Sequence, residues 1–283
     1  MNLSIIIPVY NESDTIEKVI HSTQSIYPDA EIIVVDDGSS DTSSYIAEKA
    51  GAIVIRHPYN IGNGAAIKSG IRKASGEILV FMDADGQHKP QDIEKLLALI
   101  PEYDMVVGAR KNQFKSAMIR SMGNSAYNAL ASYVTSFPVQ DLTSGFRAIK
   151  TKIAQKYLYL LPNTYSYPTT LTLSVLKSGR RLAYVPIQSD KRRSGKSQIN
   201  IIKDGVRFFM IILKICTLYS PLRIFLPFSA FIFGTGLFWY GYTWFFQGRF
   251  TNMGALLFST SVIVFLMGLI SEQICQMRFE KSE

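Results

Sequence analysis

The sequence predicts an α/β domain with a mostly parallel sheet, followed by an interfacial helix and two transmembrane helices. Two observations predict this fold class. Short runs of apolar, β-branched residues alternate with helix-like segments from residue 3 to about residue 110, which is the pattern of βαβ units. After residue 221 the chain becomes strongly apolar, with two stretches long enough to cross a bilayer. The 283 residues leave room for one such domain and a membrane anchor.

The expected strands are apolar on both faces, as in a sheet that helices cover on both sides. They are 3–9, 31–35, 52–56, 77–82, 104–109 and 182–187. Helix patterns lie near 14–26, 41–50, 64–74 and 91–100, and the region 115–180 is mainly helical apart from DLTSGFRA at 141–148. Ligands of parallel sheets bind beyond the carboxyl ends of the strands, so the polar loops at 8–12, 36–41 and 83–88 should meet at one rim.

The charge balance favours an anionic partner. A net charge of +8 is compatible with nucleic acid, a phosphorylated substrate or an acidic lipid surface. No nucleic-acid-binding motif is present, and basic residues gather just ahead of the apolar tail, which favours lipid over nucleic acid. Cys216 and Cys275 have neither metal-site spacing nor a disulfide framework, and we interpret them as small hydrophobic residues.

The C-terminal third predicts a membrane anchor. Residues 199–220 are apolar almost all round and carry spaced lysines and arginines, which fits an interfacial helix, although a core helix has the same pattern. Residues 222–246 and 253–271 can each span a hydrocarbon layer of about 30 Å. The flanks are more basic than the turn between them, which puts both termini and the domain 1–198 in the cytoplasm. The hairpin as a whole is expected at 221–277.

The stretch FMDADGQHKP (81–90) places Asp83 and Asp85 directly after an apolar run. One interpretation is a polar turn, because Asp and Gly favour turn geometry. The other is a site for a hard divalent cation, which carboxylate oxygens hold against a substrate phosphate. The residues alone leave both open.

Five blocks resemble a known family. IIIPVYNE, VVDDGSSD, HPYNIGNGAAIKSGI, FMDADGQH and DLTSGFRA stand in the order and spacing of family 2 glycosyltransferases. With the apolar tail, the sequence is similar to the polyprenyl-phosphate glycosyltransferases, the group of dolichyl-phosphate mannose synthase. The resemblance covers nearly all of residues 1–200 and implies a nucleotide-sugar-binding domain of the GT-A type.

The resemblance also implies donor-site roles. The residues expected to bind the nucleotide sugar are Pro8, Tyr10, Glu12, Val35, Asp37, Asp83, Ala84, Asp85, Gln87, Arg192 and Lys196. Of these, Asp85 and Gln87 would bind Mg²⁺ or Mn²⁺, and Arg192 with Lys196 would lie on a loop that closes over the donor. Helix capping is the alternative for Tyr10 and Glu12. The glycine-rich loop 60–70 is expected to be a turn that packs closely at a helix start, and it stays outside the site.

A lipid phosphate acceptor is already anionic at neutral pH, so it needs positive charge rather than a general base. The resemblance places this charge at Arg110, Arg120 and Arg147, with Asn124 near the acceptor phosphate. Together with Asp83 and Asp85 the three arginines form the expected catalytic set. A solvated surface charge is the alternative for Arg120 and Lys196. Asp141 is either a base or an anchor of the turn that follows it, and we favour the anchor.

These features lead to one expected function and two alternatives. We expect a membrane-bound inverting transferase that moves a hexose from a GDP-mannose-type or UDP-glucose-type donor to polyprenyl phosphate on the cytoplasmic face. One alternative is transfer to another lipid or glycan acceptor, although the sequence lacks the Q-x-x-R-W motif of processive synthases. The other is a non-catalytic membrane adaptor that binds sugar nucleotides. The expected partners are the nucleotide sugar, polyprenyl phosphate and membrane lipids, with no nucleic acid; association of copies through the apolar helices stays open.

Overall fold

The computed structural model describes residues 2–110, 118–188, 217, 220–249 and 251–280. These residues fall into two compact units, Met1–Ile199 and Asn200–Glu283. The first unit holds the sheet, and the second holds two long helices. Most of the expected interfacial helix, residues 199–220, lies outside the described residues.

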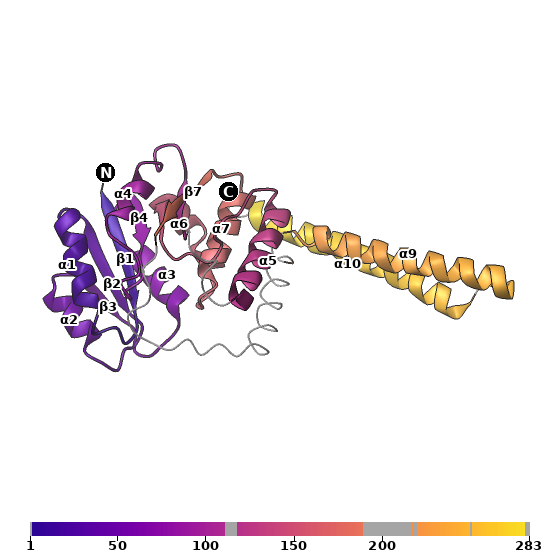
Figure 1. Cartoon of the computed structure of the whole chain (residues 1–283), viewed down its shortest axis with the longest axis horizontal. Helices are drawn as coiled ribbons and strands as arrows, with labels where there is room; N and C mark the ends of the chain where they lie inside the picture. Colours follow the sequence, from indigo (N-terminus) through magenta and orange to yellow (C-terminus); the bar gives the residue numbers. More distant parts are fainter. Residues whose placement is uncertain (1, 111–117, 189–216, 218–219, 250, 281–283) are drawn as a thin grey trace. The chain divides into compact units, whose positions relative to one another are not determined.

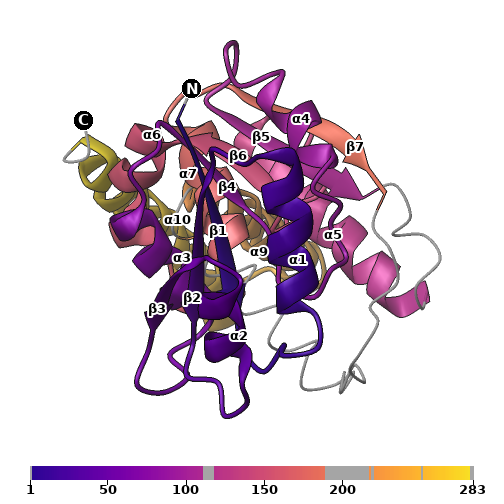
Figure 2. The same cartoon turned by 90° about the vertical axis from the view of Figure 1, so that its left-hand side faces the viewer.

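The first unit is built on a seven-stranded sheet with the order β3-β2-β1-β4-β6-β5-β7 (Figure 1; β5 and β6 are labelled in Figure 2). The strands are β1 (Leu3–Val9), β2 (Glu31–Asp36), β3 (Ile53–Arg56), β4 (Ile78–Phe81), β5 (Met105–Arg110), β6 (Arg147–Lys150) and β7 (Leu182–Ile187). Only β6 runs antiparallel to its neighbours. The mostly parallel sheet predicted from the sequence is therefore confirmed, and all six expected strands are present within one or two residues of their predicted ends.

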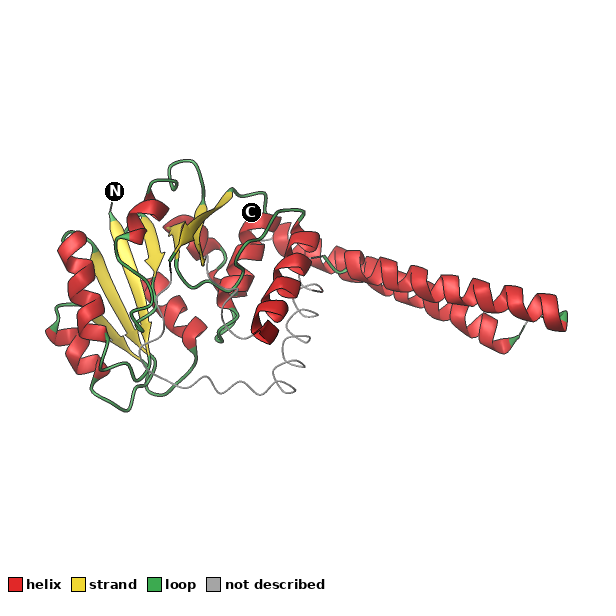
Figure 3. Cartoon of the chain, viewed as in Figure 1, coloured by secondary structure: helices red, strands yellow, loops and turns green. Residues whose placement is uncertain are grey.

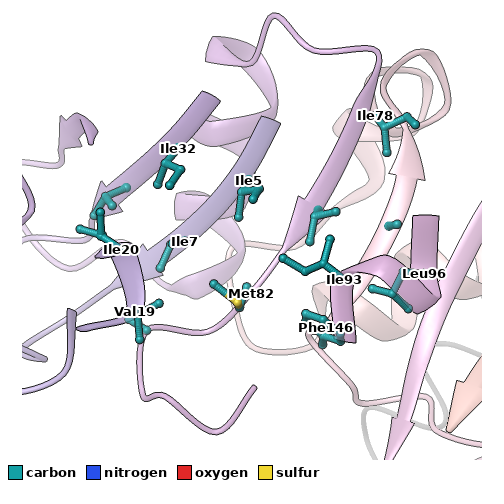
Figure 4. Close-up of a cluster of buried hydrophobic side chains, with 14 of the residues drawn as sticks. Ile5, Ile7, Val19, Ile20, Ile32, Ile78, Met82, Ile93, Leu96 and Phe146 are labelled. Atoms are coloured by element: carbon teal, nitrogen blue, oxygen red, sulfur yellow. The ribbon is translucent and has the colours of Figure 1, made fainter. Parts of the chain in front are cut away.

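Helices cover both faces of this sheet (Figures 2 and 3). They are α1 (Ile16–Ile26), α2 (Ser43–Lys49), α3 (Asn63–Lys73), α4 (Asp92–Leu97), α5 (Met118–Thr135), α6 (Thr151–Lys156), the 3₁₀ turn η2 (Leu158–Leu160) and α7 (Tyr167–Lys177). Buried side chains of α1, α2 and α4 pack on one face, where Ile5 and Ile7 point (Figure 4). Those of α3, α6 and α7 pack on the other, with Ile6. The alternation of side chains along β1 thus separates two hydrophobic clusters, as a doubly covered sheet requires.

The strand β6 was not predicted from the sequence. It is only four residues long and follows a polar loop, so its local pattern is weak. Its pairing is tertiary: Phe81 of β4 lies opposite Arg147, and Val107 of β5 lies opposite the same residue. Because β6 is antiparallel, its first residue rather than its last lies at the carboxyl ends of β4 and β5. The loop that precedes β6 therefore reaches the rim where a ligand is expected.

The second unit is an antiparallel helical hairpin of α9 (Leu222–Gln247) and α10 (Asn252–Glu280). Both helices are long and apolar enough to cross a membrane, and they contain the two expected spans. Gly236 and Gly268 allow close approach, since a Cβ on either would lie 3.1 Å or less from a side chain of the other helix. The hydroxyls of Ser229 and Ser261 meet inside the hairpin at 3.4 Å. Most large side chains face outward, including Phe245, which is 89% exposed.

A chain shortened after Pro221 should still fold into the sheet domain. All seven strands and both hydrophobic clusters lie ahead of this point. We expect the far-ultraviolet circular dichroism of a mixed α/β protein and one cooperative thermal transition. The matched control is Ile6→Asp in the same shortened chain, which puts a charge at a position of 0% exposure and should abolish that transition. A shortened chain without cooperative unfolding would show that the sheet depends on the hairpin.

Candidate functional site

The loops after β1 and β2 are joined into one structure at the rim of the sheet. The Asn11 amide N–H donates to Ser39 Oγ at 3.0 Å, and the Ser40 N–H donates back to Asn11 Oδ1 at 2.8 Å. The Glu12 N–H donates to Ser43 Oγ at 2.9 Å. Asn11 has a φ of +54°, a left-handed conformation that non-glycine residues adopt mainly in turns or at functional sites.

The loop after β4 is tied to the same structure through α1. Thr15 Oγ donates to the carbonyl oxygen of Ala84 at 2.8 Å and lies 3.3 Å from Glu12 Oε2. The Glu12 carbonyl oxygen also accepts the N–H groups of Thr15 and Ile16 at the start of α1. Glu12 thus takes part in the helix start, as the capping alternative expects, while Tyr10 is 46% exposed at the rim. The three polar loops converge as the sequence predicted.

Asp83 lies directly beyond β4, with its side chain 38% exposed. Its carboxylate is packed against the loop that β6 brings to the rim. A Cβ on Gly145 would lie 3.1 Å from Asp83 Oδ2 and 3.2 Å from Oδ1, so only glycine leaves the carboxylate undisturbed there. A second neighbour is His88, whose Nε2 lies 3.5 Å from Asp83 Oδ2.

His88 is a candidate site residue that sequence reasoning missed. Its ring is stacked on Phe146 with centroids 4.8 Å apart and planes 13° apart, and its side chain is 5% exposed. Its Nδ1 is buried without a hydrogen-bond partner among the described residues. Burial of a ring nitrogen without a hydrogen-bond partner is unfavourable. We therefore infer that the His88 ring is kept at this position for its contact with Asp83. The signal was its place at the end of the block DADGQH.

Asp85 and Gln87 are half-buried at the same loop, and the Gln87 N–H donates to Asp85 Oδ1 at 3.1 Å. Gly86 between them has a φ of +71° with space around it, which lets the loop turn. The described residues contain no cluster of three His, Cys, Asp or Glu side chains that could hold a metal ion. One carboxylate and one amide oxygen are nevertheless suited to Mg²⁺ or Mn²⁺ when a diphosphate supplies further oxygens, so the donor set fits the expected metal.

Arg110 and Asp141 form a bidentate ion pair beside this loop. Arg110 Nε lies 2.8 Å from Asp141 Oδ2, and Nη2 lies 3.0 Å from Oδ1 and 2.8 Å from Thr143 Oγ. The Asp141 side chain is 3% exposed, and that of Arg110 is 30% exposed. Burial by itself raises the pKa of the Asp141 carboxyl, but the hydrogen bonds and charge of Arg110 outweigh it, so that this pKa lies below its usual value. The geometry favours Asp141 as an anchor rather than a base.

Arg147 lies in a different setting from the one expected for a phosphate ligand. Its side chain is 0% exposed, and burial lowers the pKa of its guanidinium. Nη1 donates to the Pro168 carbonyl at 2.9 Å and to Thr172 Oγ at 3.1 Å, and Nη2 donates to the Ser144 carbonyl. The first position of β6 directs this side chain into the packing against α7. Its expected contact with the acceptor stays a prediction; the structure places Arg147 beneath the loop that holds Asp83.

The Asp37 carboxylate also accepts its hydrogen bonds from groups inside the protein. Its carboxylate is 3% exposed and accepts hydrogen bonds from the backbone N–H groups of Ile61 and Gly62 and from the ring of His57. Pro8 and Val35 are buried neighbours at the ends of β1 and β2, and Ala84 is buried after β4. Their contacts with a nucleotide stay predictions. The side chains of Arg120 and Asn124, and all of Arg192 and Lys196, lie outside the described residues.

The glycine-rich loop behaves as predicted. A Cβ on Gly62 would lie 2.3 Å from the Asn163 carbonyl oxygen, and one on Gly64 would lie 2.1 Å from that of Pro162. Gly62 has a φ of +122° and stands at the start of α3. These glycines are therefore explained by a turn and by close backbone packing.

The profile of glycosyl transferase family 2 matches residues 4–158. The chain belongs to this family. A second profile, the GtrB C-terminal hairpin, matches residues 220–277 and so spans α9 and most of α10.

Two curated relatives of this family 2 chain extend the comparison. An uncharacterised protein of Methanocaldococcus jannaschii is 35% identical over 196 residues, which cover 65% of this chain and 80% of that protein. The undecaprenyl-phosphate 4-deoxy-4-formamido-L-arabinose transferase of Proteus mirabilis is 27% identical over 292 aligned positions, covering 96% of this chain and 88% of its own length. Among solved structures, the glucosyl-3-phosphoglycerate synthase of Mycobacterium tuberculosis matches with a TM-score of 0.61 at 21% identity, covering 76% of this chain and 79% of that one. This likeness shows the GT-A fold.

Gly145→Ala should impair glycosyl transfer with little effect on folding. The added methyl group would lie 3.1 and 3.2 Å from the two oxygens of Asp83, which is closer than ordinary van der Waals contact, so the carboxylate has to shift by a few tenths of an ångström. Small misplacements at a reacting centre are costly, and we expect kcat/KM to fall roughly tenfold. The control is Gly241→Ala, a helical glycine of α9 with open space around it. Unchanged kcat/KM in Gly145→Ala would show that the position of the Asp83 carboxylate against Gly145 does not affect the reaction.

Asp141→Asn should lower stability at neutral pH but not in acid. A carboxyl whose folded pKa is depressed contributes stability above its unfolded pKa of about 3.9, and this is lost as the pH falls through the folded value. The difference in free energy of unfolding between the parent chain and Asp141→Asn should therefore be constant above about pH 5 and shrink below about pH 4. Denaturant titrations in detergent at several pH values measure it, with the exposed Asp29→Asn as control. An equal difference in the free energy of unfolding at pH 3 and pH 7 would show that Asp141 does not stabilise the fold through its ionised carboxylate.

Proposed function

We propose that this family 2 chain transfers a hexose from a nucleoside diphosphate sugar to polyprenyl phosphate on the cytoplasmic face of a membrane. The donor is of the GDP-mannose or UDP-glucose type, and the product is polyprenyl-phosphate hexose. The observation that carries the proposal is the combination, in one chain, of a glycosyltransferase rim with a hairpin that matches the GtrB profile. The Proteus mirabilis relative, named as an undecaprenyl-phosphate sugar transferase, aligns over 96% of this chain and therefore over both parts.

The donor is proposed to lie across the joined loops. Tyr10, Glu12 and Asp37 are placed near the base and ribose, against the ends of β1 and β2 where Pro8 and Val35 lie. Support comes from structures of the Mycobacterium tuberculosis synthase in complex with UDP and Mn²⁺ or Mg²⁺, which share this fold. Ala84 and Asp83 would line the sugar end. Arg192 and Lys196 are assigned to a loop over the donor on the resemblance alone.

Asp85 and Gln87 are the residues proposed to hold Mg²⁺ or Mn²⁺. When bound, this ion would neutralise charge on the diphosphate as it leaves. The chain's own contribution is to fix the loop: Thr15 holds it at Ala84, and the Gly86 turn sets Asp85 and Gln87 side by side. Asp83 lies separately against His88 and Gly145, and its 38% exposed side chain is proposed to meet ribose or sugar hydroxyls.

The acceptor is proposed to approach from the side of Arg110. A phosphate oxygen of the lipid attacks the anomeric carbon, the bond from that carbon to the diphosphate breaks, and its electron pair leaves with the diphosphate. Attack opposite the leaving group inverts the anomeric centre. Arg110 keeps a 30% exposed side chain that can meet the phosphate, and Arg120 with Asn124 would complete the contact. Arg147 is proposed to act from beneath, through the loop at Ser144.

The hairpin gives the proposed reaction its location. Residues 221–277 would cross the membrane twice, and 199–220 would lie in the interface, so that the catalytic domain 1–198 and both termini face the cytoplasm. The basic flanks of the hairpin support this orientation. The acceptor's apolar chain then stays in the bilayer while its phosphate reaches the rim. Association of copies through the hairpin is compatible with its exposed apolar side chains.

The function is tested by transfer from labelled GDP-mannose and UDP-glucose to a short polyprenyl phosphate. We expect one donor to give a lipid-phosphate hexose with the full chain and Mg²⁺ or Mn²⁺. Asp85→Ala should reduce turnover by at least about 10²-fold, the cost of losing leaving-group stabilisation. The matched control is Asp29→Ala, an exposed carboxylate ahead of β2. Full activity in excess EDTA would contradict the requirement for a metal ion. Transfer to diacylglycerol or a glycan, and none to polyprenyl phosphate, would contradict the proposed acceptor. No transfer from any donor would favour a non-catalytic adaptor.

A further inference from the structure

A buried chain of hydrogen bonds joins Asp37, His57 and Ser69. His57 follows β3 directly and is 8% exposed. Its Nδ1 lies 2.7 Å from Asp37 Oδ1, and its Nε2 lies 2.9 Å from Ser69 Oγ on α3. A carboxylate only accepts hydrogen bonds, so the ring donates to Asp37 from Nδ1, while Nε2 pairs with the Ser69 hydroxyl. Both ring nitrogens are thus used inside the protein.

The same carboxylate organises the segment 57–62, the β3–α3 loop. Asp37 Oδ1 also accepts the Ile61 N–H at 3.0 Å, and Oδ2 accepts the Gly62 N–H at 2.7 Å. Gly62 stands immediately before α3, where a negative charge is favoured by the helix dipole. With three donors on two oxygens, Asp37 has little remaining capacity for a ligand.

The β3–α3 loop lies directly on the second loop of the rim. A Cβ on Gly38 would stand 2.5 Å from the carbonyl carbon of Tyr59 and 2.8 Å from the Asn60 nitrogen, so the two backbones are in contact. Tyr59 is 66% exposed next to this contact. The loop therefore forms a wall beside the residues to which the proposed function assigns the base and ribose. Asp37 is joined to this loop through the N–H groups of Ile61 and Gly62, and His57 is the third hydrogen-bond partner of the same carboxylate.

We propose that His57 is a positioning residue of the donor site, which holds the β3–α3 loop as a rigid wall at the nucleotide end. The proposal rests on the proposed function, because that function places the nucleotide beside Asp37. His57 touches no reacting atom, so its loss should weaken nucleotide binding without slowing transfer at saturating donor.

Two amide variants separate the two hydrogen bonds of the ring. His57→Asn places an amide N–H near the position of Nδ1 and keeps a donor for Asp37. His57→Gln reaches toward the position of Nε2 and loses the Asp37 contact. We expect His57→Gln to raise the dissociation constants of UDP and GDP roughly tenfold, the loss expected for a buried charge-assisted hydrogen bond, and His57→Asn to stay close to the parent chain. The matched control is His21→Gln, an exposed histidine of α1.

Three measurements on the full chain in detergent decide the matter. Calorimetry with UDP and with GDP, in the presence of Mn²⁺, gives nucleotide affinity. Hydrogen exchange of the Ile61 and Gly62 amides reports the wall directly and should accelerate in His57→Gln. Steady-state transfer should show a raised donor KM, with kcat and acceptor KM within about twofold of the parent.

The outcomes distinguish this inference from the function on which it rests. Faster exchange at Ile61 and Gly62 with unchanged nucleotide affinity would overturn the role of His57 alone. Equal losses of nucleotide affinity in His57→Asn and His57→Gln would show that the hydrogen bond to Asp37 is not what holds the loop. If His57→Gln does not fold, Ser69→Ala removes the other link and should raise the dissociation constants about threefold; unchanged constants would overturn the proposal. A parent chain that binds neither nucleotide would refute the proposed function itself.

Discussion

The pairing of Phe81 with Arg147 is the constraint on which the rest of the site depends. It inserts a short antiparallel strand between β4 and β5, and so brings the loop before that strand to the carboxyl end of β4. The same loop supplies Gly145 and Phe146, which seat Asp83 and stack on His88. It also supplies Asp141, which holds Arg110 at the end of β5. A parallel strand in this place would carry its leading loop to the opposite edge of the sheet, away from Asp83.

The rim divides its carboxylates into two groups. Asp37 and Asp141 are almost fully buried and accept several hydrogen bonds each from protein groups, so they hold loops in place. Asp83 and Asp85 are only half-buried, and they stand beyond a strand on a loop with a left-handed glycine. Burial with several hydrogen bonds to the protein fixes a carboxylate in place, whereas partial exposure lets a ligand reach its oxygens. The chemistry proposed for this chain uses Asp83 and Asp85. Asp37 and Asp141 hold the loops that keep these two carboxylates in position.

Sequence reasoning succeeded where the pattern is local. The parallel strands, the helices on both faces, the packing role of Gly62 and Gly64 and the two apolar helices each follow from residues close together in the chain. It failed where the signal is tertiary. β6 has too few residues to show a period, and without it the inward direction of Arg147 could not be foreseen. His57 contacts Asp37, which is 20 positions away in the sequence, and His88 contacts Asp83, which is 5 positions away. Only the folded rim shows these two contacts.

The paired state of Arg110 bears on how the proposed acceptor could be both held and released. Asp141 and Thr143 use Nε and Nη2, and among the described residues no partner meets Nη1. The ion pair is close to neutral as a unit, so its attraction for phosphate comes from the remaining N–H groups rather than from a full uncompensated charge. A phosphate monoester carries a charge of about −1.5 to −2 at neutral pH. Transfer of the sugar turns it into a diester with a single negative charge. A compensated arginine binds that product more weakly than it binds the acceptor, while Asp141 keeps the guanidinium in position for the next phosphate.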